Sequence, residues 1–173
     1  GGVVARVGGR DVSAPRVGTH RAERYTIEKA RRFATGSSGG TGGAGDSCVL
    51  TAYGVVQGMR ASAAHVWGTP SLAGKTIGIA GVGKVGSLLS ALALDDGARV
   101  VVTDVNAAAI DALLEKHPEI DVAPDALALV RSECDVYAPC APGGALDPAT
   151  VHVLSATGVC DAAINQLPGQ GPG

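Results

Sequence analysis

The sequence predicts an α/β fold built on a doubly wound, mostly parallel sheet. Three observations carry this prediction. Apolar strand-like runs alternate with helical patterns beyond residue 46, a glycine-rich segment joins the first run to the helical pattern after it, and an acidic residue ends the second run. Such alternation is typical of parallel sheets with helices on both faces. Their ligands bind at the carboxyl ends of the strands.

The strands and helices are expected in a regular order. The first helix is expected to begin at Asp46 or Ser47, to run to about Trp67 and to stop at Gly68. Its predicted apolar face consists of Ala52, Val55, Val56, Met59, Ala63 and Val66. Strands are expected near 76–80, 99–103, 120–122, 134–138 and 157–160. Helices between them are expected at 84–95, 107–117, 124–131 and 148–154, the first two ended by Gly97 and Pro118.

A G-x-G-x-x-G pattern follows the first strand-like run, at Gly81, Gly83 and Gly86. In a dinucleotide-binding turn, the first glycine lets the chain turn sharply and the second lets the backbone approach a pyrophosphate. The third allows helix and strand to pack closely. Unpaired N–H groups at the start of the helix then face the phosphates, assisted by the helix dipole. The alternative is a tight strand-to-helix turn that binds nothing.

Asp104 ends the second strand-like run. A carboxylate there would accept hydrogen bonds from an adenosine ribose and repel a 2′-phosphate, which favours NAD over NADP. Strand, glycines, helix and acid together form the fingerprint of a Rossmann NAD-binding domain. We therefore expect NAD as the cofactor.

The composition is that of a globular protein. The chain has 173 residues, of which 46% are hydrophobic and 3% aromatic, so the core is expected to consist of Ala, Val, Leu and Ile. The net charge of -2 indicates no basic surface for nucleic acid, and no apolar run is long enough to span a membrane. The first residues do not have the pattern of a signal peptide, and none is expected. We expect neither a nucleic-acid nor a membrane partner.

The four cysteines, at positions 48, 134, 140 and 160, lack C-x-x-C spacing. This favours reduced thiols in a cytoplasmic protein over zinc ligation, and no metal is expected. Cys140 lies in a candidate loop, where it is either a nucleophile or a small packing residue. The lack of a nearby histidine in the sequence favours packing.

Two loops follow the fourth and fifth predicted strands, at 137–145 and 160–167, and both are rich in small residues. Small residues permit a flat ring to pack against the backbone. Asn165 in the second loop carries an amide that both donates and accepts hydrogen bonds. Spacing alone leaves open an ordinary turn for the first loop and a surface or capping amide for Asn165.

The first 45 residues differ from the rest of the chain. Residues 36–45 have the composition of a flexible glycine-rich linker, and the segment before them is irregular apart from a helix expected at 25–33. Basic residues in that segment form either a solvated face or an anion-binding patch. A domain boundary is therefore expected at residues 45–46.

Several segments resemble the Glu/Leu/Phe/Val amino-acid dehydrogenases. They are residues 42–55, 78–86, 101–104, 135–141 and 143–144. Within this family the sequence most resembles bacterial valine dehydrogenases. The resemblance implies NAD-dependent oxidative deamination of a branched-chain L-amino acid, of valine or leucine type, to the 2-oxo acid and ammonia, without a metal. It also implies that full-length relatives are homo-oligomers.

The resemblance implies roles for individual residues. Thr51 matches a threonine that contacts the nicotinamide carboxamide, and Asn165 matches an asparagine beside substrate and nicotinamide. Cys140 and Ala141 match the loop that borders the nicotinamide ribose. The cofactor-binding set is completed by Gly81, Gly83, Lys84, Val85, Gly86 and Asp104.

The sequence also departs from the family pattern. Lys29 is its first lysine, whereas the family carries a catalytic and a substrate-binding lysine in its N-terminal domain. Glu23 stands where the family has an aspartate that assists proton transfer, and Asp161 replaces a glycine. Residues 1–45 are therefore expected to be a truncated remnant of the substrate domain plus linker. Residues 46–173 are expected to be the NAD-binding domain, without the family's C-terminal helices.

Two other functions stay open. A catalytically inactive NAD-binding module, from a truncated or decayed dehydrogenase, would account for the departures. A dehydrogenase of 2-hydroxy acids would need a His–Glu or arginine pair in a strand-end loop, and the sequence has none there.

Overall fold

The computed structural model of this chain describes residues 46–141 and 146–163. Nearly all of them belong to one compact unit, which begins at Cys48. The predictions for residues 1–45, which include the helix at 25–33, the linker and Glu23, lie outside the described residues, as does Asn165. The domain boundary at residues 45–46 therefore stays a prediction.

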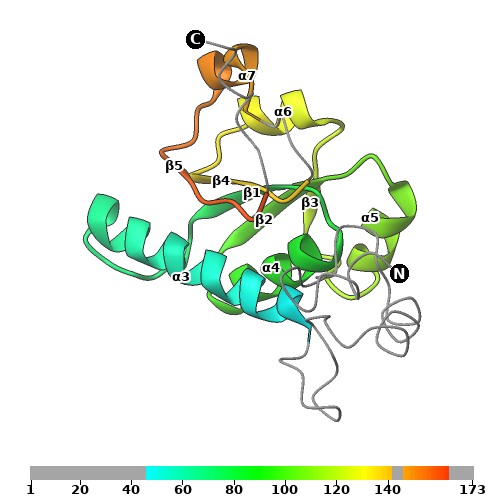
Figure 1. The fold of residues 1–173 in the computed structure, drawn as a ribbon, viewed down its shortest axis with the longest axis horizontal. Coiled ribbons are helices and arrows are strands. Elements are labelled where there is room, and N and C mark those ends of the chain that lie inside the picture. Colours follow the sequence, from blue (N-terminus) through cyan, green and yellow to red (C-terminus); the bar gives the residue numbers. More distant parts are fainter. Residues whose placement is uncertain (1–45, 142–145, 164–173) are drawn as a thin grey trace, which may run out of the picture. The chain divides into compact units, whose positions relative to one another are not determined.

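A parallel five-stranded sheet forms the centre of the described unit (Figure 1). Its strands are β1 (Thr76–Ala80), β2 (Arg99–Thr103), β3 (Asp121–Val122), β4 (Val136–Pro139) and β5 (Gly158–Val159). Their order across the sheet is β3-β2-β1-β4-β5, so the winding direction reverses between β1 and β4. Every neighbouring pair in this order is parallel. The predicted doubly wound α/β fold is confirmed.

Helices cover both faces of the sheet. They are α3 (Ser47–Trp67), α4 (Lys84–Asp95), α5 (Ala107–Leu114), α6 (Ala126–Arg131) and α7 (Pro148–Val153). Helices α3, α4 and α5 pack on one face, and α6 and α7 pack on the other (Figure 1). The alternation of strands and helices follows the predicted order.

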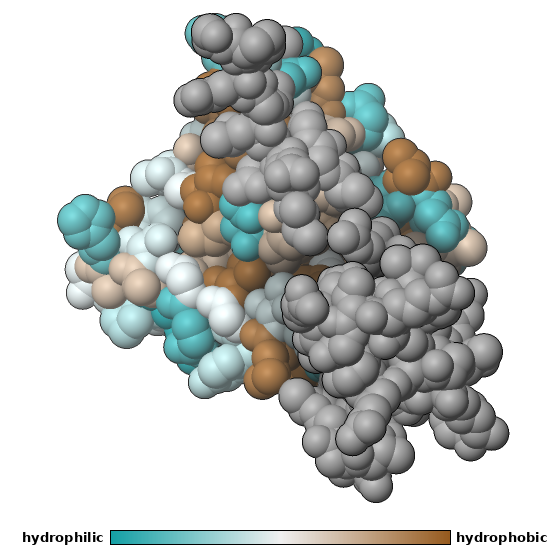
Figure 2. Space-filling view, in the orientation of Figure 1, coloured by the Kyte–Doolittle hydropathy of each residue, from teal (hydrophilic) through white to brown (hydrophobic). Residues whose placement is uncertain are grey.

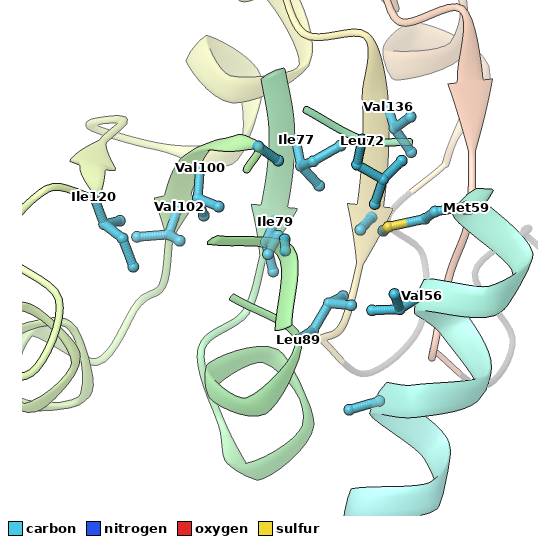
Figure 3. Close-up of a cluster of buried hydrophobic side chains, with 14 of the residues drawn as sticks. Val56, Met59, Leu72, Ile77, Ile79, Leu89, Val100, Val102, Ile120 and Val136 are labelled. Atoms are coloured by element: carbon cyan, nitrogen blue, oxygen red, sulfur yellow. The ribbon is translucent and has the colours of Figure 1, made fainter. Parts of the chain in front are cut away.

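Two layers of apolar side chains join the helices to the sheet, because alternate residues of a strand point to opposite faces. In β1, Ile77 and Ile79 belong to the layer shared with α3 and α4, whereas Ala80 belongs to the layer shared with α6. The larger layer is centred on Val56, Met59, Leu72, Ile77, Ile79, Leu89, Val100, Val102, Ile120 and Val136 (Figure 3). The core is therefore mainly aliphatic, as the composition predicts, with a buried Tyr137 in the smaller layer.

Specific residues set the ends of the helices. Gly68 adopts a φ of 73°, and its N–H donates to the Ala64 carbonyl at 3.1 Å, so it ends α3 as predicted. The Asp125 carboxylate accepts the N–H of Ala128 at 2.7 Å and caps α6. This cap explains why α6 begins at Ala126 and not at residue 124.

Two further details of the prediction are wrong. Helix α5 ends at Leu114 and not at residue 117, and a turn follows in which the N–H groups of Lys116 and His117 both donate to the Leu113 carbonyl. Val66 does not belong to the buried face of α3, since its side chain is 45% exposed. The last turns of α3 pack on the larger layer through Ala63 and Trp67 instead, and Val66 lies to the side of this contact.

A cluster of three side chains marks the edge of the sheet where β1 and β4 begin. The Lys75 ammonium lies 4.0 Å from the centroid of the Trp67 ring and 3.5 Å from Asp135 Oδ1. The other oxygen of Asp135 accepts the N–H of Thr76 at 2.8 Å. Because α3 ends beside the start of β1, it runs opposite to the strands, and its first turns lie toward the edge where the strands end.

The burial of Met59 predicts a large stability effect. Met59 is fully buried in the larger layer, so Met59→Ala leaves a cavity and should lower the free energy of unfolding by about 2–5 kcal/mol. Leu50→Ala, at a 66% exposed position of the same helix, is the control and should change it by less than about 0.5 kcal/mol. Urea denaturation followed by circular dichroism measures both. Equal losses in the two variants would contradict the described packing.

Candidate functional site

The loops that follow the strands meet at one edge of the sheet, which we call the carboxyl edge. The strand order reverses there between β1 and β4, which is the place where parallel α/β sheets bind ligands. Three backbone hydrogen bonds hold the loops: Gly81 N–H to the Thr103 carbonyl at 2.8 Å, Cys140 N–H to the Ala80 carbonyl at 2.7 Å, and Ala162 N–H to the Pro139 carbonyl at 3.2 Å.

Gly81 is required by both its conformation and its surroundings. Its φ is 101°, in the left-handed region that side chains rarely adopt. A Cβ at this position would lie 2.9 Å from the backbone nitrogen of Ala141 and 3.0 Å from the carbonyl carbon of Cys140. The turn after β1 and the loop after β4 therefore touch through their backbones.

Gly83 and Gly86 have different surroundings. A Cβ on Gly86 would collide with the carbonyl oxygen of Gly81, so packing requires this glycine. A Cβ on Gly83 would meet nothing within 4 Å, and Gly83 is the exposed N-cap of α4 without a side-chain hydrogen bond. We call the open space before Gly83, Lys84 and Val85 the cradle. It suits an anionic group, because the N–H groups of the first turn of α4 and the positive end of the helix dipole face it.

Asp104 stands at the end of β2, and both of its carboxylate oxygens accept backbone N–H groups. Oδ2 accepts from Val82 at 2.7 Å, and Oδ1 accepts from Asn106 at 2.8 Å. The first bond ties Asp104 to the glycine-rich turn, and Ser87 holds the same turn by donating its hydroxyl to the Val82 carbonyl at 2.7 Å. A carboxylate has about four acceptor sites, so capacity is left for the hydroxyl groups of a ligand.

Cys140 lies against the glycine-rich turn and is partly buried. Burial raises the pKa of its thiol to about 12, and the nearby negative charge of Asp161 adds to this, although a hydrogen bond from the Ala162 backbone opposes it. The thiol is therefore protonated at neutral pH and is a poor nucleophile. This supports a packing role for Cys140 over the nucleophile interpretation.

Most of the predicted site residues meet at the carboxyl edge. Those in the turn after β1, at the end of β2 and after β4 are Gly81, Gly83, Lys84, Val85, Gly86, Asp104, Cys140 and Ala141. Thr51 is exposed in the first turns of α3, which lie toward the same edge. Glu23 and Asn165 lie outside the described residues.

Two supports of the site were not predicted from the sequence. They are the hydrogen bond from Val82 to Asp104 and the hydroxyl bond of Ser87 to the same turn. The bond from Asn106 to Asp104 has a local signal, because aspartate side chains commonly accept the N–H two residues further on. The bond from Val82 joins two different loops, and no local pattern indicates it.

The part of the chain that the structure describes lacks the features of two other kinds of site. No three or more His, Cys, Asp or Glu side chains in it are grouped so as to hold a metal ion. No helix in it has the length and apolar character needed to cross a membrane. The four cysteines all lie in this part, and none of them forms a disulfide.

Comparison with known proteins places the chain among amino-acid dehydrogenases. It is 54% identical over 168 residues to the valine dehydrogenase of Streptomyces virginiae, an alignment that covers 96% of this chain and 47% of that protein. It is 36% identical over 167 residues to the leucine dehydrogenase of Bacillus subtilis, covering 96% of this chain and 45% of that protein. Over nearly its whole length the chain is thus similar to members of the amino-acid dehydrogenase family. No protein-family model matches it.

Solved structures share its fold. The L-tryptophan dehydrogenase of Nostoc punctiforme matches with a TM-score of 0.71 at 25% identity, covering 95% of this chain and 45% of that one. A hetero-hexameric glutamate dehydrogenase from Thermus thermophilus matches with a TM-score of 0.69 at 22% identity, covering 92% and 43%, which shows the fold alone. The described unit thus has the Rossmann fold of this family. The chain spans about half the length of the relatives it matches.

The different surroundings of Gly83 and Gly86 predict effects of very different size for the same substitution to alanine. Gly86→Ala should lower the free energy of unfolding by about 2 kcal/mol or more, because its methyl group meets backbone atoms. Gly83→Ala should change it by less than about 0.5 kcal/mol, because its methyl group meets open space. Urea titration of both variants measures the difference. A stable Gly86→Ala variant would show that the turn does not have the described close approach.

Proposed function

We propose that this chain provides the cofactor-binding part of an NAD-dependent dehydrogenase that acts on branched-chain L-amino acids, of valine or leucine type. The reaction is oxidative deamination to the 2-oxo acid and ammonia. The 54% identity to a valine dehydrogenase carries this proposal. The open cradle and the carboxylate beside it support the cofactor assignment.

The pyrophosphate of NAD fits the cradle. Gly83 leaves room for the phosphates, and the first N–H groups of α4 supply donors at the positive end of the helix. Lys84 is exposed at the same helix start and adds positive charge. The lack of a clash at Gly83 is the structural feature that a bound phosphate requires.

Asp104 explains a preference for NAD over NADP. Each carboxylate oxygen accepts one backbone N–H, so each has capacity for a further hydrogen bond from a ribose hydroxyl. A 2′-phosphate at the same place would face a fixed negative charge. The bond to Val82 means that the carboxylate is held in this position before a cofactor binds.

The nicotinamide half of the dinucleotide is assigned to the other side of the cradle, over the ends of β4 and β5. Dinucleotides lie across the crevice where the strand order reverses, and Asp104 on β2 takes the adenosine half. Cys140 and Ala141 are small, so a ring can approach the backbone. We assign Thr51 to the nicotinamide carboxamide and Asn165 to the contact between nicotinamide and substrate. Hydride acceptance is the chemistry that the nicotinamide supplies when bound.

The remaining steps rest on other residues. We assign Glu23 the proton-transfer role of the family aspartate, with a carboxylate on a longer arm. The proposed small-molecule partner is an L-amino acid or its 2-oxo acid. The proposed assembly of the whole protein is a homo-oligomer in the cytoplasm.

A catalytically inactive NAD-binding module is the second candidate. It is favoured by one pattern: the residues that we assign to the cofactor match the family pattern, while Glu23 and Asp161 stand where the family has aspartate and glycine. The side chain of Glu23 is longer than that of aspartate, so its carboxyl group is displaced from the position for proton transfer. A displacement of about 1 Å lowers the rate on the order of a hundredfold.

Cofactor binding is the first test of the proposal. The chain should bind NADH in a calorimetric titration and bind NADPH at least about tenfold more weakly, because Asp104 repels the extra phosphate. Gly83→Ala should weaken NADH binding by about tenfold or more, because its methyl group occupies the cradle. Gly58→Ala is the control, since a Cβ on Gly58 also meets nothing within 4 Å but lies further along α3 than the first turns that carry Thr51. Saturable binding that Gly83→Ala leaves intact would refute the cradle assignment.

Turnover separates the two candidate functions. L-valine or L-leucine with NAD at alkaline pH should produce NADH, which absorbance follows, and a branched 2-hydroxy acid should produce none. NADH binding without turnover of any amino acid would favour the inactive module. Oxidation of the hydroxy acid in place of the amino acids would contradict both candidates.

A further inference from the structure

Asp161 has a fixed place at the carboxyl edge. The residues on either side of it bond to β4: Cys160 N–H donates to the Tyr137 carbonyl at 3.0 Å, and Ala162 N–H donates to the Pro139 carbonyl at 3.2 Å. The backbone of Asp161 is therefore held alongside the end of β4. Its side chain is partly buried.

The end of β4 in turn touches the glycine-rich turn. Cys140, directly after β4, donates its N–H to the Ala80 carbonyl at 2.7 Å, and Gly81 follows at once in the chain. The carboxylate of Asp161 is near enough to the Cys140 thiol to raise its pKa. This thiol, protonated at neutral pH, adds no charge of its own to that side of the cradle. Asp104, the carboxylate that binds the turn itself, lies on the opposite side, at β2.

We propose that Asp161 sets the preference of the chain between the two redox states of its cofactor, so that NAD+ binds more tightly relative to NADH than it would without this carboxylate. The proposal rests on the assignment of the nicotinamide half to the ends of β4 and β5. Asp161 acts as a specificity-determining residue through its charge.

The physical reason is the charge difference between the two forms. The nicotinamide ring is positively charged in NAD+ and neutral in NADH, whereas the adenosine and pyrophosphate parts are the same in both. A carboxylate close to the ring attracts only the oxidised form, and partial burial reduces the screening of this attraction by water. Groups at the other end of the cofactor, such as Asp104 and Lys84, meet the same chemical groups in both forms.

Calorimetric titration of the chain with NAD+ and with NADH tests the proposal through the ratio of the two dissociation constants. Asp161→Asn keeps the size of the side chain and removes its charge. It should weaken NAD+ binding relative to NADH by about threefold to tenfold. Asp161→Glu keeps the charge and should keep the ratio. Added salt should reduce the difference between the wild-type chain and Asp161→Asn.

Asp95→Asn is the matched control. It removes the same charge from an exposed position at the last residue of α4, at the opposite edge of the sheet, and should leave the ratio unchanged. Circular dichroism of each variant shows whether it folds.

Each other outcome has a distinct meaning. If both cofactors bind and Asp161→Asn leaves the ratio unchanged, the role of Asp161 is refuted and the cofactor proposal stands. If Asp161→Asn and Asp161→Glu change the ratio equally, shape and not charge is responsible, and the role is again refuted. If the wild-type chain binds neither NAD+ nor NADH, the cofactor proposal is contradicted and the role of Asp161 with it.

Discussion

The close approach of backbones at the carboxyl edge is the constraint on which the rest of the structure depends. Gly86 faces the carbonyl of Gly81, and Gly81 faces the backbone of Ala141. Neither glycine has room for a Cβ. The start of α4 therefore packs tightly on the glycine-rich turn that precedes it, and the loop after β4 packs on the same turn. Side chains could not make this contact, because any side chain would push the elements apart. Two segments far apart in the sequence therefore meet at one point, beside the reversal of the strand order.

The candidate site follows from this contact. The turn is crowded on the side that faces the protein and open at Gly83, so a ligand approaches backbone atoms held in place by the core beneath them. Asp104 adds a second restraint by accepting the N–H of Val82. The charge varies along the carboxyl edge. It is positive at the start of α4, negative at Asp104 and neutral at the Cys140 thiol. Such an arrangement distinguishes the parts of an extended ligand that carry different charges.

The sequence predicts the fold and the glycine-rich turn well, because both depend on local patterns. Apolar periodicity locates the strands, and the glycine spacing locates the turn at Gly81–Gly86. The exposure of Val66 could not be predicted, since it depends on which side of the last turns of α3 packs on the core, and Ala63 and Trp67 make that contact. The raised pKa of Cys140 depends on burial by distant segments, and the partner of Asp104 lies in another loop. These properties arise from tertiary contacts that no window of the sequence contains.

The cluster of Trp67, Lys75 and Asp135 has a practical consequence for spectroscopy. Trp67 is the single tryptophan of the chain, and it is held at the edge where the strands begin, under the ammonium group of Lys75. Its emission therefore reports on the junction between α3 and β1. An unfolding transition that separates this junction changes the emission directly, whereas local rearrangement of the glycine-rich turn takes place at the other edge of the sheet. The protein thus carries an intrinsic fluorophore that separates global unfolding from local events in its candidate site.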